Sequence, residues 1–156
     1  MEWTQIGNYF YLLIDALSQG TNTLGVAKGL CRGLSDDESE VELFEPRSLE
    51  EQNVVLQTIA PWITISSLGG SPPKFWINAI KKGDGDGYTY MSDGAKVPDT
   101  FWKPGQRTNT FVMLDSSNGK WEDVTFSNMG YTICQVSTKL INPNCEDEKG
   151  MGKLVN

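Results

Sequence analysis

The stretch that decides the fold is FVMLDSSNGKWEDVTFSNMGYTICQV, residues 111–136, in which short β-prone runs alternate with turns. Asn118-Gly119 separates two apolar-bearing runs, and both residues tolerate the positive φ angles of a tight hairpin turn. A second turn is predicted at 128–130. The segment is therefore predicted to form a three-stranded meander, with strands over Phe111–Leu114, Lys120–Val124 and Tyr131–Val136.

Length and composition limit the class of protein. A chain of 156 residues suits one domain with its own core. Aromatic residues make up 10% of the chain and there are 16 glycines, so a loop-rich fold is favoured over a helical bundle. The net charge of -7 argues against nucleic acid as a partner, because phosphates require a basic surface. No apolar run approaches the ~20 residues that cross a bilayer, so no membrane span is predicted.

The chain contains no histidine, which removes the commonest general base and the commonest transition-metal ligand. A zinc site would have to be built from three scattered cysteines and carboxylates. Asp84 and Asp86 lie in a glycine-rich turn that lacks the twelve-residue pattern of an acidic calcium loop. We therefore expect no enzymatic activity, no catalytic residue and no metal site.

Three strands are predicted upstream of this stretch, and one of them is the short run Leu43-Phe44-Glu45, which is stopped by Pro46. Trp3–Leu13 is rich in aromatic and β-forming residues and is predicted to be one opening strand. Phe75–Ile80, which follows two prolines, is predicted to be a central strand.

Two helices are also predicted. The first follows Thr23, with its apolar residues at Leu24, Ala27, Leu30 and Cys31. The second begins at a capping box formed by Ser48 and Glu51. Its apolar side is expected to carry Val54, Leu56 and Ile59.

Five motifs of this chain resemble motifs of the C-type lectin-like domain family, and they occur in the same order as in that family. The most specific is LFEPRSLEEQ (43–52), which is similar to the family's entry into its second helix. The others are WTQIGNYF (3–10), Trp76-Ile77-Asn78, the long-loop stretch YTYMSDGAKVPDTFWKPGQ (88–106), and the pair Trp121-Glu122-Asp123 with Tyr131, Ile133 and Cys134. The resemblance implies an α+β fold with two helices flanking small antiparallel sheets and a long loop region. It implies a short-form domain over residues 1–137, followed by a polar tail over 138–156.

The resemblance also implies a disulfide between Cys31 and Cys134, and hence a secreted or extracellular location. The alternative is two buried free thiols in a reducing compartment. Cys145 is then left over in the tail. We expect it to link two chains covalently; the alternative is a free thiol without a role.

The chain departs from the family at the residues that bind calcium and sugar. Gln106-Arg107-Thr108 stands where the family has Glu-Pro-Asn or Gln-Pro-Asp, and Glu122 stands where it has Asn. Only Asp123 is a clear retained ligand, whereas calcium requires about six to eight oxygens. We therefore expect no cofactor, with residual calcium binding as the alternative. Our hypothesis is that Arg107 pairs with Glu122 or Asp123 and takes over part of the calcium's charge-balancing role; the alternative is an ordinary exposed arginine.

A second departure concerns the disulfide that the family places across the hairpin. Phe111 and Phe126 occupy the two positions of that disulfide, and if both rings fill that space they can contact each other. Trp102 and Trp121 are expected to lie in the core rather than to stack on a ligand.

The leading function is therefore a non-catalytic extracellular recognition module that binds a protein or a glycan without calcium. One alternative is a calcium-dependent lectin with an atypical site. Another is a structural or matrix protein that binds mineral or ice, or assembles, through the acidic run Asp36–Glu42. The candidate ligand-binding residues lie on the loop face and on the strand after the hairpin: Trp102, Lys103, Gln106, Arg107, Thr108, Asn109, Glu122 and Asp123.

Overall fold

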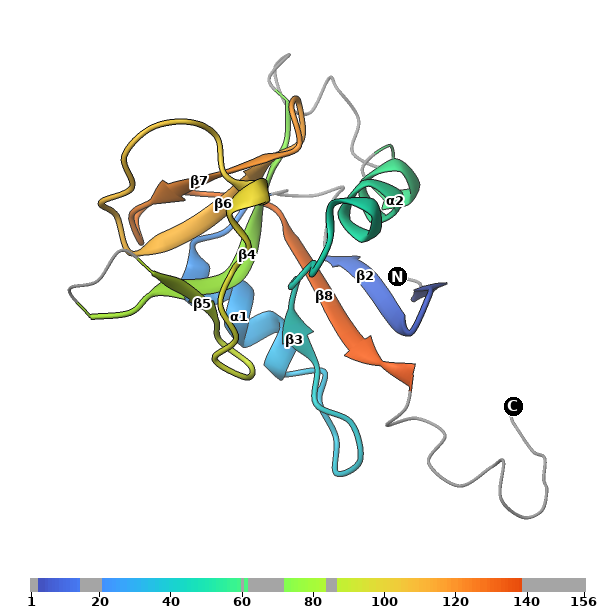
Figure 1. The fold of residues 1–156 in the computed structure, drawn as a ribbon. Helices are drawn as coiled ribbons and strands as arrows, with labels where there is room; N and C mark the ends of the chain where they lie inside the picture. Colours follow the sequence, from blue (N-terminus) through green and yellow to red (C-terminus); the bar gives the residue numbers. More distant parts are fainter. Residues whose placement is uncertain (1–2, 15–20, 60, 62–71, 84–86, 139–156) are drawn as a thin grey trace.

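The computed structural model describes residues 3–14, 21–59, 61, 72–83 and 87–138. Two helices, α1 (Leu24–Arg32) and α2 (Leu49–Ile59), lie beside two four-stranded sheets (Figure 1). Every strand pairing is antiparallel. This arrangement confirms the expected α+β class. No helix in these ranges is long and apolar enough to cross a membrane.

The two sheets are built from segments that are far apart in sequence. The first sheet has the order β1 (Thr4–Ile6), β2 (Tyr9–Ile14), β8 (Thr132–Ser137), β3 (Glu42–Leu43). The second has the order β5 (Tyr88–Tyr90), β4 (Lys74–Lys81), β6 (Phe111–Asp115), β7 (Lys120–Val124). The long segment between β5 and β6 contains a short 3-10 helix, η3 (Asp99–Phe101). The central strand predicted at Phe75–Ile80 is confirmed as part of β4.

The opening stretch forms a hairpin of two strands rather than the single strand predicted. The chain reverses between Ile6 and Tyr9, which face each other across the pair. Gly7 in this turn has φ 63°, a left-handed conformation that costs glycine little and most other residues more. The single strand was predicted from the β-forming residues alone, without allowing for the turn at Gly7 that divides them.

The hairpin at Asn118-Gly119 is confirmed, although its loop spans residues 116–119 rather than two residues. Gly119 has φ 71° and donates its N–H to the Asp115 carbonyl at 2.8 Å. The predicted meander is wrong in its third strand. β8 does not pair with β7; it crosses into the other sheet, where it pairs with β2 and β3.

The crossing occurs at Gly130, where the chain passes close to β4 and β6. A Cβ atom at this position would lie 2.3 Å from Cε of Met113 and 3.3 Å from the Lys74 carbonyl oxygen. Five of the six residues of β8, the strand that follows Gly130, are buried. A strand that is buried on both faces must be covered by other elements on both sides, and a position at the edge of the second sheet would not provide that cover. Figure 1 shows β8 running between β2 and β3.

Both predicted helices are present, but each buries a slightly different face. α1 buries Leu24, Ala27 and Cys31, whereas Leu30 is 39% exposed. α2 buries Gln52, Val55 and Ile59, which recur at three- and four-residue spacing. Val54, predicted to be apolar core, is 42% exposed.

The α2 cap forms in a modified way. The Glu51 N–H donates to Oγ of Ser48 at 3.1 Å, as a capping box requires. The Glu51 carboxylate, however, accepts the backbone N–H of Arg47 at 2.9 Å.

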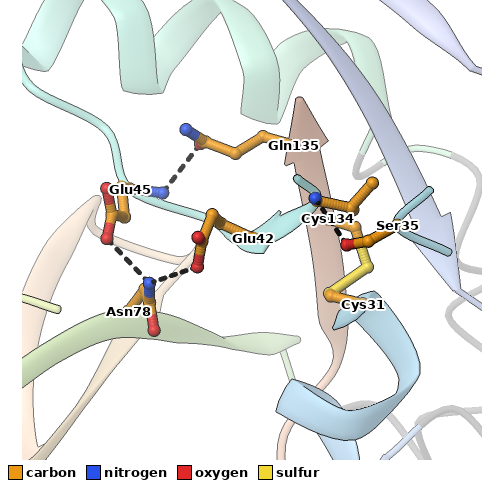
Figure 2. The surroundings of a disulfide bond; sticks show 8 residues. Cys31, Ser35, Glu42, Glu45, Asn78, Cys134 and Gln135 are labelled. Carbon is orange, nitrogen blue, oxygen red and sulfur yellow. Dashed lines mark hydrogen bonds between the residues drawn. A yellow bond between two sulfur atoms is a disulfide. The ribbon is translucent and has the colours of Figure 1, made fainter. Parts of the chain in front are cut away.

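The Cys31–Cys134 disulfide is confirmed and joins α1 to β8 across 103 residues of sequence (Figure 2). Both cysteines are fully buried. Alternate β2 residues pack into two different clusters, with Tyr11 and Leu13 on the α2 side and Leu12 and Ile14 on the disulfide side. The first sheet is thus covered on both faces.

Candidate functional site

The predicted site surrounds the loop over residues 103–110, which connects η3 to β6 and lies beside β6 and β7 (Figure 1). Its base is Trp102, only 8% exposed. The Trp102 ring lies 4.7 Å from the Tyr88 ring and 5.8 Å from the fully buried Trp121 ring, measured between centroids. The expectation that Trp102 and Trp121 belong to the core is therefore confirmed.

Asp123 is the residue that holds the loop in place. Its Oδ2 accepts the backbone N–H groups of Thr108 at 2.9 Å and of Asn109 at 2.7 Å. Hydrogen bonds to a carboxylate are stronger than those between neutral groups, typically by about twofold. The carboxylate that resembles a retained calcium ligand thus serves as the anchor of the loop backbone.

Tyr88, which the sequence did not single out, supports the same loop. Its hydroxyl donates to the backbone carbonyl of Asn109. Burial, together with the nearby Asp123 carboxylate, raises the pKa of Tyr88 to about 12, so the phenol remains a donor at neutral pH. The loop enters β6 directly afterwards, where the Thr110 carbonyl accepts the Lys81 N–H at 2.9 Å.

Glu122 is neutralised by two lysines. Its carboxylate lies 2.7 Å from Nζ of Lys74 and 3.2 Å from Nζ of Lys103, and its side chain is 14% exposed. The hydrogen bond to Glu122 raises the pKa of Lys74 above its ordinary value. Lys74 begins β4 and was not predicted, because nothing in the local sequence indicates that β4 and β7 lie in the same sheet.

Arg107 makes a different contact from the one hypothesised. Its guanidinium lies over the Trp102 ring, 4.5 Å from the centroid, and forms no ion pair with Glu122 or Asp123. A cation over an indole face is a favourable arrangement, worth about 0.5–1 kcal/mol at exposed sites. Arg107 thus keeps its charge without a carboxylate partner, and the hypothesised ion pair is wrong.

Contacts place seven of the eight predicted residues in three groups: Asp123 with Thr108 and Asn109, Glu122 with Lys103, and Trp102 with Arg107. Gln106 lies on the same loop with an exposed side chain and contacts none of the others through a hydrogen bond. The exposed side chains of the face are those of Lys103, Gln106 and Thr108, and Arg107 is half-buried. Glu122 and Asp123, together with Asp115 opposite Lys74 on the neighbouring strand, balance the charges of Lys74, Lys103 and Arg107.

The turn after β7 presents two large apolar side chains to solvent. Phe126 is 73% exposed and Met129 is 52% exposed. The turn is held by Asn128, whose Oδ1 accepts the Thr125 N–H at 2.9 Å. Phe111 is half-buried against the core, whereas the Phe126 ring lies largely in solvent, so the two rings do not both fill the space of the family's disulfide.

A buried polar network supports the other end of the long-loop region. The Glu45 carboxylate, 3% exposed, accepts a hydrogen bond from Nδ2 of Asn78 at 2.7 Å (Figure 2). It also accepts the Ser92 N–H at 3.0 Å. The Arg47 guanidinium lies 3.0 Å from Glu45 and 3.9 Å above the centroid of Tyr90. This network ties the segment after β5 to the start of α2. The sequence indicates Asn78 only as part of the Trp76-Ile77-Asn78 motif, and its role as a donor depends on tertiary contacts.

The acidic run Asp36–Glu42 forms a loop with its own internal bonds. Oδ1 of Asp36 accepts the N–H groups of Glu38 at 2.9 Å and Ser39 at 2.8 Å. Within the described part of the chain, no group of three or more Asp, Glu, Cys and His side chains is arranged to hold a metal ion. Asp84, Asp86 and Cys145 lie outside the described residues.

Comparison with known proteins supports the fold. Neither family models nor curated protein sequences gave a match. Among solved structures, the C-type lectin CEL-I from Cucumaria echinata aligns with a TM-score of 0.70 and 21% identity, over 86% of this chain and 94% of that one. The mouse scavenger receptor C-type lectin carbohydrate-recognition domain aligns with a TM-score of 0.63 and 19% identity, over 86% and 95%. Human lithostathine aligns with the same TM-score and identity, over 86% and 88%.

These three alignments cover most of this chain and most of each solved structure, and they match its two helices and two small antiparallel sheets. This chain therefore has the C-type lectin-like fold.

Proposed function

We propose that this protein is a non-catalytic, extracellular recognition module that binds a glycan or protein ligand through the 103–110 loop face without calcium. The recognition role is supported by the fold, which it shares with proteins described as C-type lectins and as a carbohydrate-recognition domain. The Cys31–Cys134 disulfide fits an oxidising compartment.

One observation carries the calcium-independent part of the proposal. Oδ2 of Asp123 is already occupied by two backbone N–H donors, so the loop is held by the protein alone. Glu122 is paired with two lysines, and Arg107 places a permanent cation over Trp102. Calcium binding would compete with these contacts, and the set lacks the six to eight oxygens that calcium prefers.

The exposed groups of the face suit either ligand class. Lys103, Gln106 and Thr108 offer donors and acceptors that can bind sugar hydroxyls or a polar protein surface. Phe126 and Met129 follow Asp123 closely in sequence. Both side chains are exposed and add apolar surface, which is typical of protein interfaces.

The test is to screen the protein against a glycan array and an array of extracellular protein domains, once with calcium and once with a chelator. We expect binding to survive chelation and to fall with Arg107→Ala. Arg32→Ala, which removes another exposed arginine at the end of α1, is the matched control and should leave binding unchanged.

Two results would contradict the proposal. Loss of binding on chelation, with no effect of Arg107→Ala, would favour the calcium-dependent alternative, in which Asp123 is a metal ligand. A calcium dissociation constant below about 1 mM in calorimetry, which is within the range of extracellular modules, would do the same. Mineral or ice adsorption that is lost when Asp36–Glu42 is neutralised would instead favour the structural-protein alternative.

A further inference from the structure

A groove of about 450 Å³ lies between the β1–β2 turn and the first turns of α2. In Figure 1, β2 and α2 lie on the right of the molecule, whereas the 103–110 loop lies at the upper left. The volume falls in the range of about 300–1,000 Å³ that is typical of ligand sites. The groove is thus separate from the face described above.

One part of the groove lining is apolar. Ile6 and Tyr9 face each other across the hairpin and are both half-buried, with the Tyr9 ring packed 6.1 Å from the Tyr11 ring. Val54 on α2 also lines the groove and is 42% exposed. These three side chains form a partly open apolar wall with one aromatic face.

The other part of the lining is anionic. Glu50 is exposed and has no hydrogen-bond or ion-pair partner among the described residues. Glu51 accepts the hydroxyl of Tyr11 at 3.0 Å and the N–H of Arg47 at 2.9 Å, and both of these donors are neutral. Neither carboxylate is therefore neutralised by a cation.

Arg47 also lines the groove but its charge is used elsewhere. Its guanidinium lies 3.0 Å from Glu45 and 3.2 Å from Asp93, and 3.9 Å over the Tyr90 ring. The groove therefore combines an apolar wall with two negative charges that lack a counter-charge.

We propose that this groove binds a basic, extended segment of a protein partner, with a Lys or Arg stem along Ile6, Tyr9 and Val54 and its cationic end at Glu50 and Glu51. Lysine and arginine bury their aliphatic stems on apolar surface while their charged ends meet anions, and a tyrosine face attracts cations. This site does not depend on the function proposed for the loop face.

The sheet edge favours a peptide over a free amine. β1 is the end strand of its sheet and pairs only with β2 among the described strands. Ile6, the last residue of β1, and Gly7 beside it line the groove. An extended segment can pair with such an edge through its backbone while its side chains enter the adjacent groove. The net charge of -7 also attracts a basic partner.

The probe is a fluorescent peptide in which arginine alternates with valine, and binding is followed by fluorescence polarisation in the presence of a chelator. We expect Glu50→Gln to weaken binding by up to about fivefold, as loss of one exposed charge contact predicts. The matched control is Glu38→Gln, which removes an exposed carboxylate of the acidic loop and should leave binding unchanged. Tyr9→Leu should also weaken binding, because it removes the aromatic face.

Two comparisons test the chemistry. A peptide with glutamine in place of arginine should bind more weakly. Agmatine, a small molecule that carries a guanidinium and an ammonium on a short aliphatic stem, should not compete at concentrations at which the peptide saturates. Amide chemical shifts should change at residues 6–9 and 48–54. Equal effects of Glu50→Gln and Glu38→Gln, shift changes confined to residues 103–109, or agmatine binding as tightly as the peptide would overturn the proposal.

Discussion

The indole Nε1 of Trp121 donates a 2.7 Å hydrogen bond to Oε1 of Gln52, although the two residues are 69 positions apart. The same glutamine donates its Nε2 to the Gly119 carbonyl at 2.8 Å. Both Gln52 and Trp121 are fully buried. One amide therefore fixes α2 to the β6–β7 hairpin and orients the tryptophan on which the loop face rests.

We predict that Gln52→Leu lowers stability by about 1–3 kcal/mol, because it leaves the buried Trp121 N–H without an acceptor. At about 2–4 °C per kcal/mol for a domain of this size, the melting temperature should fall by roughly 2–12 °C. Gln106→Leu, on the exposed loop, is the control and should shift the transition by much less. Equal melting temperatures for the two variants would show that the buried amide contributes nothing.

Reduction of the Cys31–Cys134 disulfide should lower the melting temperature by roughly 10–20 °C. The bridge closes a loop that spans 103 residues of sequence separation, which corresponds to about 4–5 kcal/mol in the chain-entropy model. The measurement is calorimetry of a Cys145→Ser background with and without reductant, so that the third thiol does not contribute. A transition that does not move after complete reduction would refute this role for the bridge.

Asp123→Ala should release the loop backbone. Loss of the acceptor for the Thr108 and Asn109 amides removes two charge-assisted hydrogen bonds, which are worth about 1.5–3 kcal/mol each. Hydrogen exchange at these two amides should therefore accelerate on the order of tenfold or more. Glu122→Ala is the control, since its carboxylate bonds lysine side chains and not the loop backbone. Unchanged exchange in Asp123→Ala would show that the loop is held by other contacts.

Asp93 should contribute to stability in a pH-dependent way. The Ala95 N–H and the Arg47 guanidinium both donate to its carboxylate and lower its pKa below the ordinary value. A depressed folded-state pKa gives stability that is present above the unfolded value of about 3.9 and is lost as pH falls through the folded value. The melting temperature of the wild type should therefore exceed that of Asp93→Asn at pH 6, and the difference should disappear toward pH 2. A difference that grows as pH falls would contradict the sign of this shift.

Much of the fold follows from local patterns. The β6–β7 hairpin, both helices and the central strand β4 are predicted correctly, because turn residues and apolar periodicity act over a few positions. The resemblance to C-type lectin-like domains adds the Cys31–Cys134 pairing and the place of the loop face. The departures at Arg107, Thr108 and Glu122 are likewise visible in the sequence.

Pairings between distant segments required the tertiary structure. Whether β8 joins β7 or lies between β2 and β3 depends on the close passage at Gly130 and on cover for both of its faces. The helical pattern does not distinguish Val54 from Val55, because adjacent residues on a helix differ by only 100° and the packed sheet decides which one is buried.

The ion pairs of the candidate site likewise depend on the tertiary structure rather than on the sequence alone. Sequence alone shows that Glu122 and Arg107 carry opposite charges near one loop, which allows their pairing but equally allows an ordinary exposed arginine. In the folded chain the Glu122 carboxylate pairs with Lys74, which is 48 positions away in sequence, and the Arg107 guanidinium lies over the Trp102 ring. Ion pairs depend on distances of a few ångströms, which the packing of the two sheets determines and the order of residues does not.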